Sequence, residues 1–188
     1  MASSSASAAS PLHTFNPIFD VNGVSMEEVA LMSHLVLRGN PDNADFAGGV
    51  KKALGVALPG RLQSAENGER VIRWISPDEW LVTAPASDGK TLEAALRDGI
   101  SAHFSVVDVS GGQTLVNVSG GNAEEMLRKC TTYDIHPRNF PIGKVVTSTL
   151  AKSQAVIRRT GDEAFELVIR RSFADYCWKW MVDAAKHW

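Results

Sequence analysis

The chain has 188 residues, of which 44% are hydrophobic and 21% are charged, which is ordinary usage for a globular protein with one substantial core or two small fused subdomains. A net charge of −2 provides no basic surface for nucleic acid or an anionic membrane, so we expect neither partner. No run approaches the roughly 20 apolar residues that a membrane-spanning helix needs, which predicts a soluble protein.

The first residues are rich in serine and alanine and lack the basic start and the continuous apolar stretch of a secretory signal. They predict a flexible N-terminal arm over residues 1–16, followed by a single folded domain over residues 17–188. A capping box from Ser25 to Glu28, with a hydrophobic staple between Val24 and Val29, favours a helix over residues 26–36. The internal repeat described next instead requires a strand over residues 31–38, and we prefer the strand.

The first half of the chain then alternates strand and helix patterns. The strand ending at Gly39 leads into a capped helix over residues 42–54, whose acidic first turn suits the helix dipole. Two apolar runs within residues 71–82 flank Ser76-Pro77-Asp78-Glu79, which reads as a hairpin turn. A helical pattern at 91–96 and a strand at 104–109 complete this unit. We expect Trp80 to be buried, and Asp78 and Glu79 to lie near the surface or to cap a neighbouring backbone.

The same order recurs in the second half. A strand at 114–119 precedes a helix capped by Asn122, a hairpin at 156–168 whose Phe165 points inward, and a helix at 173–181. The repeated β-α-β-β-α unit divides the domain into halves of about 29–110 and 111–188. It predicts an α+β fold of two fused ferredoxin-like subdomains, with antiparallel sheets and helices packed on one face.

Candidate catalytic groups are sparse. An acidic turn that occurs in both hairpins is more simply a solvated turn than a catalytic dyad, because exposure supplies no desolvation to raise a carboxyl pKa. The glycine-rich segments at 110–113 and 119–122 match no nucleotide-binding motif. They favour plain turns over anion binding. Cys130 and Cys177 are far apart, and the histidines outside the 131–144 loop lack ligand spacing, so we predict a reducing cytoplasm and no metal site.

Two segments are candidate partner interfaces. The irregular stretch 131–144 contains His136 and Arg138, which could bind a carboxylate, although no nucleophile lies nearby and docking to a partner is the preferred interpretation. In the last helix Trp178 and Val182 fall among charged residues, and an exposed aromatic residue there would mark a partner surface. The opposite, inward stripe of that helix consists of Phe173, Tyr176, Cys177, Trp180, Met181 and Ala184.

Three stretches carry a family resemblance, namely Pro77–Trp80, Asp134–Arg138 and Ser172–Tyr176. With their surroundings they resemble the gamma subunit of heterotetrameric sarcosine oxidase over about residues 29–188, a family similar to the aminomethyltransferase (T-protein) fold. The resemblance implies a complex with alpha, beta and delta subunits that oxidises sarcosine to glycine, hydrogen peroxide, and formaldehyde or methylene-tetrahydrofolate. It also implies that FAD, FMN, NAD, tetrahydrofolate and zinc belong to the other subunits.

The gamma family has no assigned catalytic residue, so we predict no catalytic, cofactor-binding or metal-binding residue in this chain. Three alternatives stay open at this level. One is the gamma-type subunit of a related demethylase acting on another N-methyl amino acid. The second is a stand-alone folate-binding one-carbon protein. The third is a small homodimeric carboxylate-binding module that uses His136 and Arg138.

Overall fold

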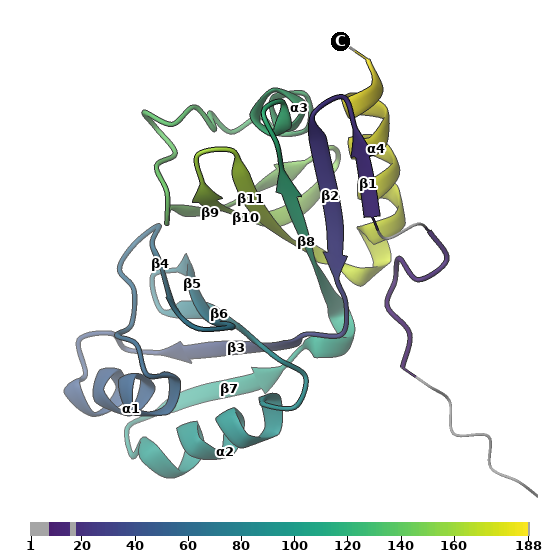
Figure 1. Cartoon of the computed structure of the whole chain (residues 1–188). Coiled ribbons are helices and arrows are strands. Elements are labelled where there is room, and N and C mark those ends of the chain that lie inside the picture. The colour runs from purple at the N-terminus through teal and green to yellow at the C-terminus, as the bar shows by residue number, and fades with distance from the viewer. Residues whose placement is uncertain (1–7, 16–17, 188) are drawn as a thin grey trace, which may run out of the picture.

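The computed structural model describes residues 8–15 and 18–187, and in this part of the chain the strands form two antiparallel sheets (Figure 1). The first sheet contains β3 (Ser33–Gly39), β4 (Ser64–Asn67), β5 (Arg70–Ser76), β6 (Glu79–Ala84) and β7 (Phe104–Asp108), in the spatial order β4-β5-β6-β3-β7. The second sheet contains β1 (Ile18–Val21), β2 (Val24–Val29), β8 (Gln113–Ser119), β9 (Val145–Leu150), β10 (Ser153–Gly161) and β11 (Ala164–Arg170), in the order β1-β2-β8-β11-β10-β9.

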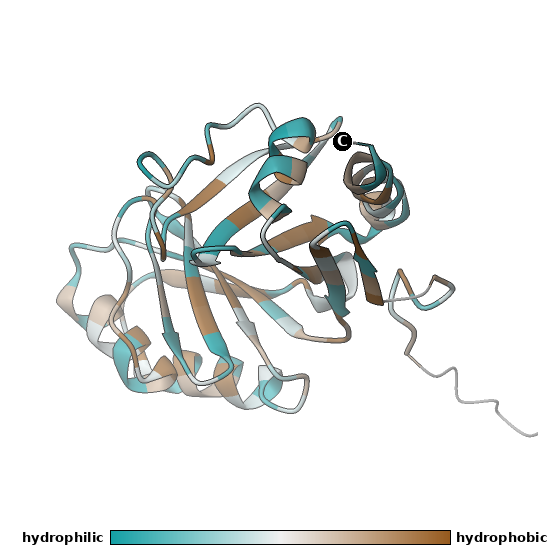
Figure 2. Cartoon of the chain, turned by 45° about the horizontal axis from the view of Figure 1, so that its top comes forward, coloured by the Kyte–Doolittle hydropathy of each residue, from teal (hydrophilic) through white to brown (hydrophobic). Residues whose placement is uncertain are grey.

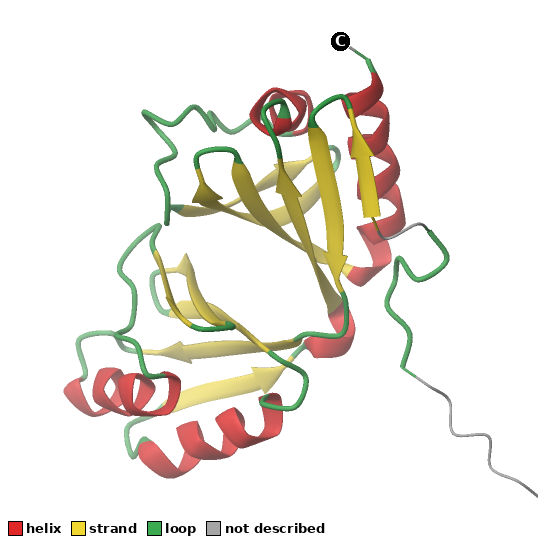
Figure 3. Cartoon of the chain, in the orientation of Figure 1, coloured by secondary structure: helices red, strands yellow, loops and turns green. Residues whose placement is uncertain are grey.

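Helices cover the outer face of each sheet. The helices α1 (Ala44–Leu54) and α2 (Gly89–Gly99) pack on the first sheet, and α3 (Ala123–Cys130) and α4 (Ala174–Lys186) pack on the second. Figure 3 shows the resulting order of layers, with the uncovered faces of the two sheets turned toward each other. The α+β prediction of antiparallel sheets with helices on one face is therefore confirmed.

The internal repeat is visible in the hairpins. Register shifts occur at the same place in both, between Trp74 and Ser76 in β5–β6 and between Arg159 and Gly161 in β10–β11. The helix-side partners Trp80 and Phe165 are both buried, as predicted. Each half also contains a strand that the sequence pattern did not reveal, β4 in the first and β9 in the second.

The two halves differ in where their last strand comes from. In the first half, β7 follows α2 and pairs antiparallel with β3. In the second half the equivalent place beside β8 is taken by β2, from near the start of the chain. The second subdomain is therefore completed by residues that precede the first one in sequence.

The segment around Ser25 is a strand and not a helix. Its alternating side chains Val24 and Met26 enter the core beneath α3 and α4, which a helix would not allow, and its backbone pairs with β8. The turn that follows contains Leu31 at φ 58°, and β3 begins at Ser33. Tertiary pairing thus overrides the local capping box, and the preferred strand at 31–38 is confirmed over the helix.

Cap chemistry was predicted correctly at one helix and wrongly at another. The Asn43 side chain caps α1 by accepting bonds from the backbone N–H groups of Asp45 and Phe46, at 3.0 and 3.3 Å. At α3 the Asn122 side chain makes no cap bond. Its amide instead donates to the carbonyl of Asn22 at 2.8 Å, so it fastens the β1–β2 turn to the second half.

The N-terminal segment is packed where the structure describes it. Leu12 is fully buried in the second core, and the Ser10 hydroxyl donates to the buried carboxylate of Glu28 at 2.6 Å. The Thr114 hydroxyl satisfies the other oxygen of Glu28, also at 2.6 Å. Residues 8–15 therefore differ from the flexible arm expected over 1–16. Residues 1–7 and 16 of that prediction lie outside the described residues.

Replacing Leu12 by alanine is expected to lower the free energy of unfolding by about 2–5 kcal/mol, because it opens a cavity in the second core. The urea midpoint should fall while the slope of the transition stays unchanged. Ile142, which is exposed, provides the control, since Ile142→Ala should change stability by less than about 0.5 kcal/mol. Equal midpoints for the two variants would mean that the N-terminal segment does not stay packed in solution.

The last helix is rotated relative to the prediction. Its buried residues are Ala174, Cys177, Trp178, Met181 and Ala185. Trp178 is 4% exposed whereas Trp180 is 41% exposed, so the expectation of an exposed Trp178 is wrong. Residues 171–173 form a separate 3₁₀ turn, in which Phe173 is exposed. Phe15 of the N-terminal segment packs against the same core as Trp178. Val182 is half-buried.

Candidate functional site at the seam between the sheets

The two sheets meet through few apolar contacts. Side chains alternate along each strand, so one set faces the helices and the other faces the opposite sheet. Between the sheets lies a small cluster of Leu81, Leu115 and Val168, flanked by the half-buried Val29, Val36, Ile75 and Val156. Hydrophobic residues follow the strands of both sheets in Figure 2, but the large cores lie on the helix sides. The seam is thus where polar groups become buried.

Two arginines from the repeated Val-Ile-Arg motif converge on one carboxylate in this seam. Arg73 of β5 is 1% exposed and pairs with Glu166 of β11, and Arg158 of β10 pairs with the same carboxylate at 3.1 Å. Arg73 also donates to the Thr83 hydroxyl at 2.7 Å. Because Arg73 and Glu166 belong to different sheets, this cluster ties the two halves together.

The outer side of the cluster is also satisfied. Arg158 donates to the Ser64 hydroxyl at 2.9 Å and pairs with Glu66 of β4. Burial alone would raise the pKa of Glu166, but Arg73 and Arg158 outweigh it and the pKa is lowered. Glu166 is therefore ionised at neutral pH and fully engaged. Because two arginines neutralise its charge, the Glu166 carboxylate links the two sheets and is not available as an acid or base.

His34 lies next to this cluster on β3, directly opposite Thr83 in the sheet register. Its Nδ1–H donates to the carbonyl of Met32 at 3.0 Å, while Nε2 is buried and has no hydrogen-bond partner among the described residues. Burial lowers the pKa of His34 to about 4. The charge of Arg73 also lowers this pKa, and the hydrogen bond to the Met32 carbonyl partly opposes the effect. The imidazole is therefore neutral at physiological pH.

This histidine predicts a pH dependence of stability. The unfolded chain binds a proton at His34 below about pH 6.5, and the folded chain does not until about pH 4, so stability should fall with decreasing pH in that window. The slope from this group is up to about 1.4 kcal/mol per pH unit. Urea unfolding at pH 7, 6 and 5 should show it in the wild type and in His103→Gln, an exposed control, but not in His34→Gln.

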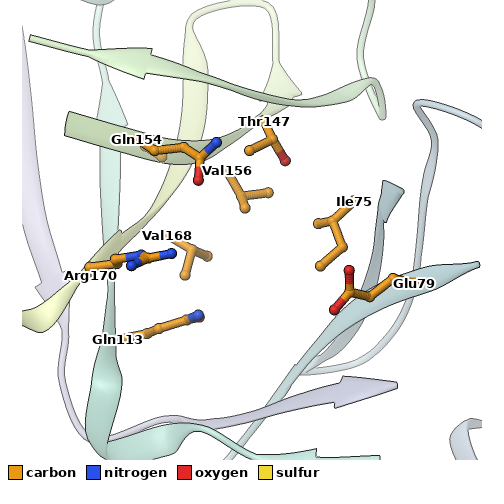
Figure 4. A pocket seen from close by; sticks show the side chains of 9 residues that line it. Ile75, Glu79, Gln113, Thr147, Gln154, Val156, Val168 and Arg170 are labelled. Carbon is orange, nitrogen blue, oxygen red and sulfur yellow. The ribbon is translucent and has the colours of Figure 1, made fainter. Parts of the chain in front are cut away.

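A cavity of about 280 Å³ opens in the seam beside the apolar cluster (Figure 4). Ile75, Val156 and Val168 form its apolar wall, and Glu79, Gln113 and Arg170 are among its polar groups. The figure shows Glu79 on one side and Arg170 with Gln113 on the other, all with their polar ends toward the cavity. Gln113 closes the glycine-rich segment 110–113, and Arg170 ends a further Val-Ile-Arg run at 168–170, but neither pattern predicted that the two residues line a cavity.

The two carboxylates of the first acidic turn, Asp78 and Glu79, have different surroundings. Asp78 lies at the surface as predicted, with Arg38 Nε 3.0 Å from its carboxylate. The hydrogen bond from Arg38 holds the pKa of Asp78 below its ordinary value. Glu79 is half-buried and lines the cavity, because it precedes the helix-side Trp80 on β6 and so faces the seam, as Leu81 does. Asp78 and Glu79 have the same intermediate exposure and neither is buried, so the expected position near the surface holds for both.

The residues predicted to face a partner do not form one surface. His136 and Arg138 are exposed on the loop between α3 and β9, where the His136 ring accepts a bond from the Arg138 backbone N–H at 3.2 Å. Figure 1 places this loop beside β9 at one edge of the second sheet and α4 beside β1 at the other edge. Trp178 and Val182 of α4 therefore lie apart from the loop, and none of the four reaches the seam cavity.

The two thiols are buried and unpaired. Burial raises the pKa of Cys130 to about 12 and that of Cys177 to about 11, so neither is a thiolate at neutral pH. We expect the folded chain at pH 8 to react with Ellman's reagent only slowly, and both thiols to react within minutes in guanidinium. Rapid modification of either thiol in the folded chain would contradict this burial.

Two further kinds of feature are absent from the part of the chain that the structure describes. Across residues 8–15 and 18–187, no helix is both long and apolar enough to cross a membrane. Over the same residues, no group of three or more His, Cys, Asp or Glu side chains is arranged to hold a metal ion.

Comparison with known proteins gives a family. Residues 38–187 match the family described as sarcosine oxidase, gamma subunit. Sarcosine oxidase subunit gamma of Corynebacterium sp. (strain P-1) is 32% identical over 166 residues, covering 86% of this chain and 79% of the relative. The Arthrobacter sp. subunit is 31% identical over 164 residues, with the same shares covered.

Comparison with solved structures leads to the same family. A chain of the heterotetrameric sarcosine oxidase from Corynebacterium sp. U-96, in complex with pyrrole 2-carboxylate, superposes with a TM-score of 0.86 at 26% identity over 95% of both chains. The aminomethyltransferase T of Bartonella henselae gives a TM-score of 0.65 at 14% identity, covering 85% of this chain and 45% of that one, which shows a shared fold. The resemblance noted in the sequence is thereby confirmed, and the chain belongs to the sarcosine oxidase gamma subunit family.

Proposed function

We propose that this chain is the gamma subunit of a heterotetrameric sarcosine oxidase and serves its assembly without carrying the chemistry. The observation that supports this most strongly is the superposition over 95% of both chains on a chain of such a complex. The complex oxidises the N-methyl group of sarcosine, releasing glycine, hydrogen peroxide, and formaldehyde or methylene-tetrahydrofolate. Its other chains are an alpha, a beta and a delta subunit, and it works in the cytoplasm.

The state of the ionisable groups supports a non-catalytic role. In the seam, Arg73, Arg158 and Glu166 neutralise one another, and His34 is buried with a low pKa. The thiols of Cys130 and Cys177 are protonated. These groups offer no activated nucleophile with an attendant base. FAD, FMN, NAD, tetrahydrofolate and zinc are then held by the other subunits, and none by this chain.

The contact surface proposed for the partner subunits includes the exposed His136 and Arg138 of the 131–144 loop. Ile135 and Phe140, both fully buried, anchor that loop in the core on either side of the exposed pair. The loop therefore presents these two polar side chains from a fixed position. On α4 the half-buried Val182 stays a candidate, and Trp178 contributes only the edge of a shallow depression shared with Phe15.

Co-purification of the tagged chain from its native host tests the proposal. Recovery of three companion chains with flavin absorbance, and peroxide formation on adding sarcosine, is the expected result. Arg138→Ala and His136→Ala should weaken recovery of the companions while Arg171→Ala, an exposed arginine in the turn before α4, should not. All three variants should keep the thermal midpoint of the wild type.

Other outcomes would select among the alternatives. A complex that oxidises N-methylglutamate in place of sarcosine would indicate the related demethylase. A colourless, folded, solitary chain would contradict assembly into an oxidase, and saturable binding of tetrahydrofolate by that chain would establish the one-carbon alternative. Loss of binding to a simple carboxylate in Arg138→Ala would instead indicate the carboxylate-binding module.

A further inference from the structure

We infer that the seam cavity binds a small zwitterionic amino acid, with Arg170 receiving its carboxylate and Glu79 its ammonium group. Assembly with the other subunits does not require this binding site. The inference rests on the geometry of the cavity, on polar groups left without partners, and on the charges at its two sides.

The cavity is built by both halves of the chain. Arg170 at the end of β11 lies directly opposite Gln113 at the start of β8 in the sheet register, so the two form one polar wall. Glu79 at the start of β6 belongs to the other sheet and faces them across the cavity (Figure 4). The opposite charges are therefore separated by a space that exists only because the two sheets meet.

These polar groups have unused binding capacity. Among the described residues, the Arg170 side chain has no hydrogen bond and no ion pair, and Gln113 Oε1 is buried without a donor. Glu79 receives one long hydrogen bond, from the Ser76 hydroxyl at 3.5 Å, and Arg38, which lies opposite it in the register, forms its ion pair with Asp78. The neighbouring Arg73 and Arg158, by contrast, are both paired with carboxylates. The donors of the Arg170 guanidinium are therefore free to bind an anion in the cavity.

The lining defines the ligand by its chemistry. A guanidinium binds a carboxylate through two parallel hydrogen bonds, and the Glu79 carboxylate accepts hydrogen bonds from an ammonium group. A dicarboxylate would bring a negative charge against Glu79, and a diamine would bring a positive charge against Arg170. The wall of Ile75, Val156 and Val168 suits an aliphatic side chain. A volume of about 280 Å³ admits a molecule of amino-acid size.

Isothermal titration of the full-length chain with sarcosine, L-proline and L-valine tests this inference, with acetate and methylammonium as probes that carry one charge each. At least one zwitterion should bind saturably at one site per chain, and the single-charge probes should bind at least tenfold more weakly. Arg170→Gln and Glu79→Gln should each weaken the zwitterion at least tenfold. The matched controls are Arg171→Gln, beside Arg170 but outside the cavity, and Glu163→Gln in the turn of the second hairpin.

A further variant separates a structural effect from a binding effect. Gln154 is an exposed residue of the cavity wall, so Gln154→Trp should fill the cavity and abolish binding while the thermal midpoint stays within about 2 °C of the wild type. The absence of saturable binding for all three zwitterions would overturn the inference. So would equal weakening by the control variants, or acetate binding as tightly as the zwitterion. None of these results would affect co-purification with companion chains, so the two proposals fail separately.

Discussion

Replacing Glu166 by glutamine is expected to lower the free energy of unfolding by about 3–5 kcal/mol, because it leaves the buried Arg73 charge without its carboxylate. Arg158 loses one of its two acidic partners in the same step, although Glu66 remains. For a chain of this size the loss corresponds to a fall in thermal midpoint of roughly 6–20 °C. Urea unfolding and calorimetry of the purified chain would measure it.

The control for this variant is Glu163→Gln, on an exposed turn of the same hairpin, which should change stability by less than about 0.5 kcal/mol. Replacing Arg73, Arg158 and Glu166 together by hydrophobic residues of similar size should recover most of the loss, because no unpaired charge then stays buried. A cost below about 1 kcal/mol for Glu166→Gln would mean that the arginines find water or other partners and that the seam is looser than described.

The same variant should change the acid limb of the stability curve. Since the folded-state pKa of Glu166 is lowered by its arginines, its contribution is fully present above the unfolded value near 4.3 and is lost as pH falls through the folded value. Glu166→Gln removes that loss. His34 acts between about pH 6.5 and 4, so the two effects occupy largely separate windows.

Trp178 and Trp180 are two positions apart on α4, and their alanine variants are expected to differ sharply. Trp178→Ala should cost about 3–5 kcal/mol, because the side chain is buried in the second core and its removal leaves a large cavity. Trp180 is 41% exposed and contacts the Tyr176 ring at a centroid distance of 5.9 Å. Trp180→Ala should therefore cost about 1 kcal/mol or less. Chemical denaturation of both variants, side by side, measures the difference.

The opposite ranking, with Trp180→Ala the more damaging, would mean that α4 presents the face predicted from its sequence and that the N-terminal segment does not cover it. Co-purification adds a second readout. Because Trp180 and Phe173 are both exposed at about two-fifths of their surface, their alanine variants should cost little stability, and reduced co-purification would then indicate a lost partner contact.

The sequence by itself determined the class and the repeat. Strand alternation, helical spacing and turn residues are local signals, and they recur in the same order in both halves, so the α+β architecture and the two hairpins could be read directly. The burial of Trp80 and Phe165 followed from the same periodicity. The short edge strands β4 and β9 escaped notice because their sequences carry little hydrophobic alternation.

Only the tertiary structure decided which elements and faces meet. The strand β2 completes the second sheet from far away in sequence, against a local capping signal. Leu12 and Phe15 of the N-terminal segment join the same core as Trp178, which is buried, whereas Trp180 is exposed. The buried ion-pair cluster between the sheets was not predicted either. The arginine that ends the apolar Val-Ile-Arg run in both hairpins could have indicated it. Periodicity defines the faces of a strand or helix, but which face is buried depends on a partner element that long-range packing supplies. For this reason the sequence did not predict that Glu79, Gln113 and Arg170 line one cavity.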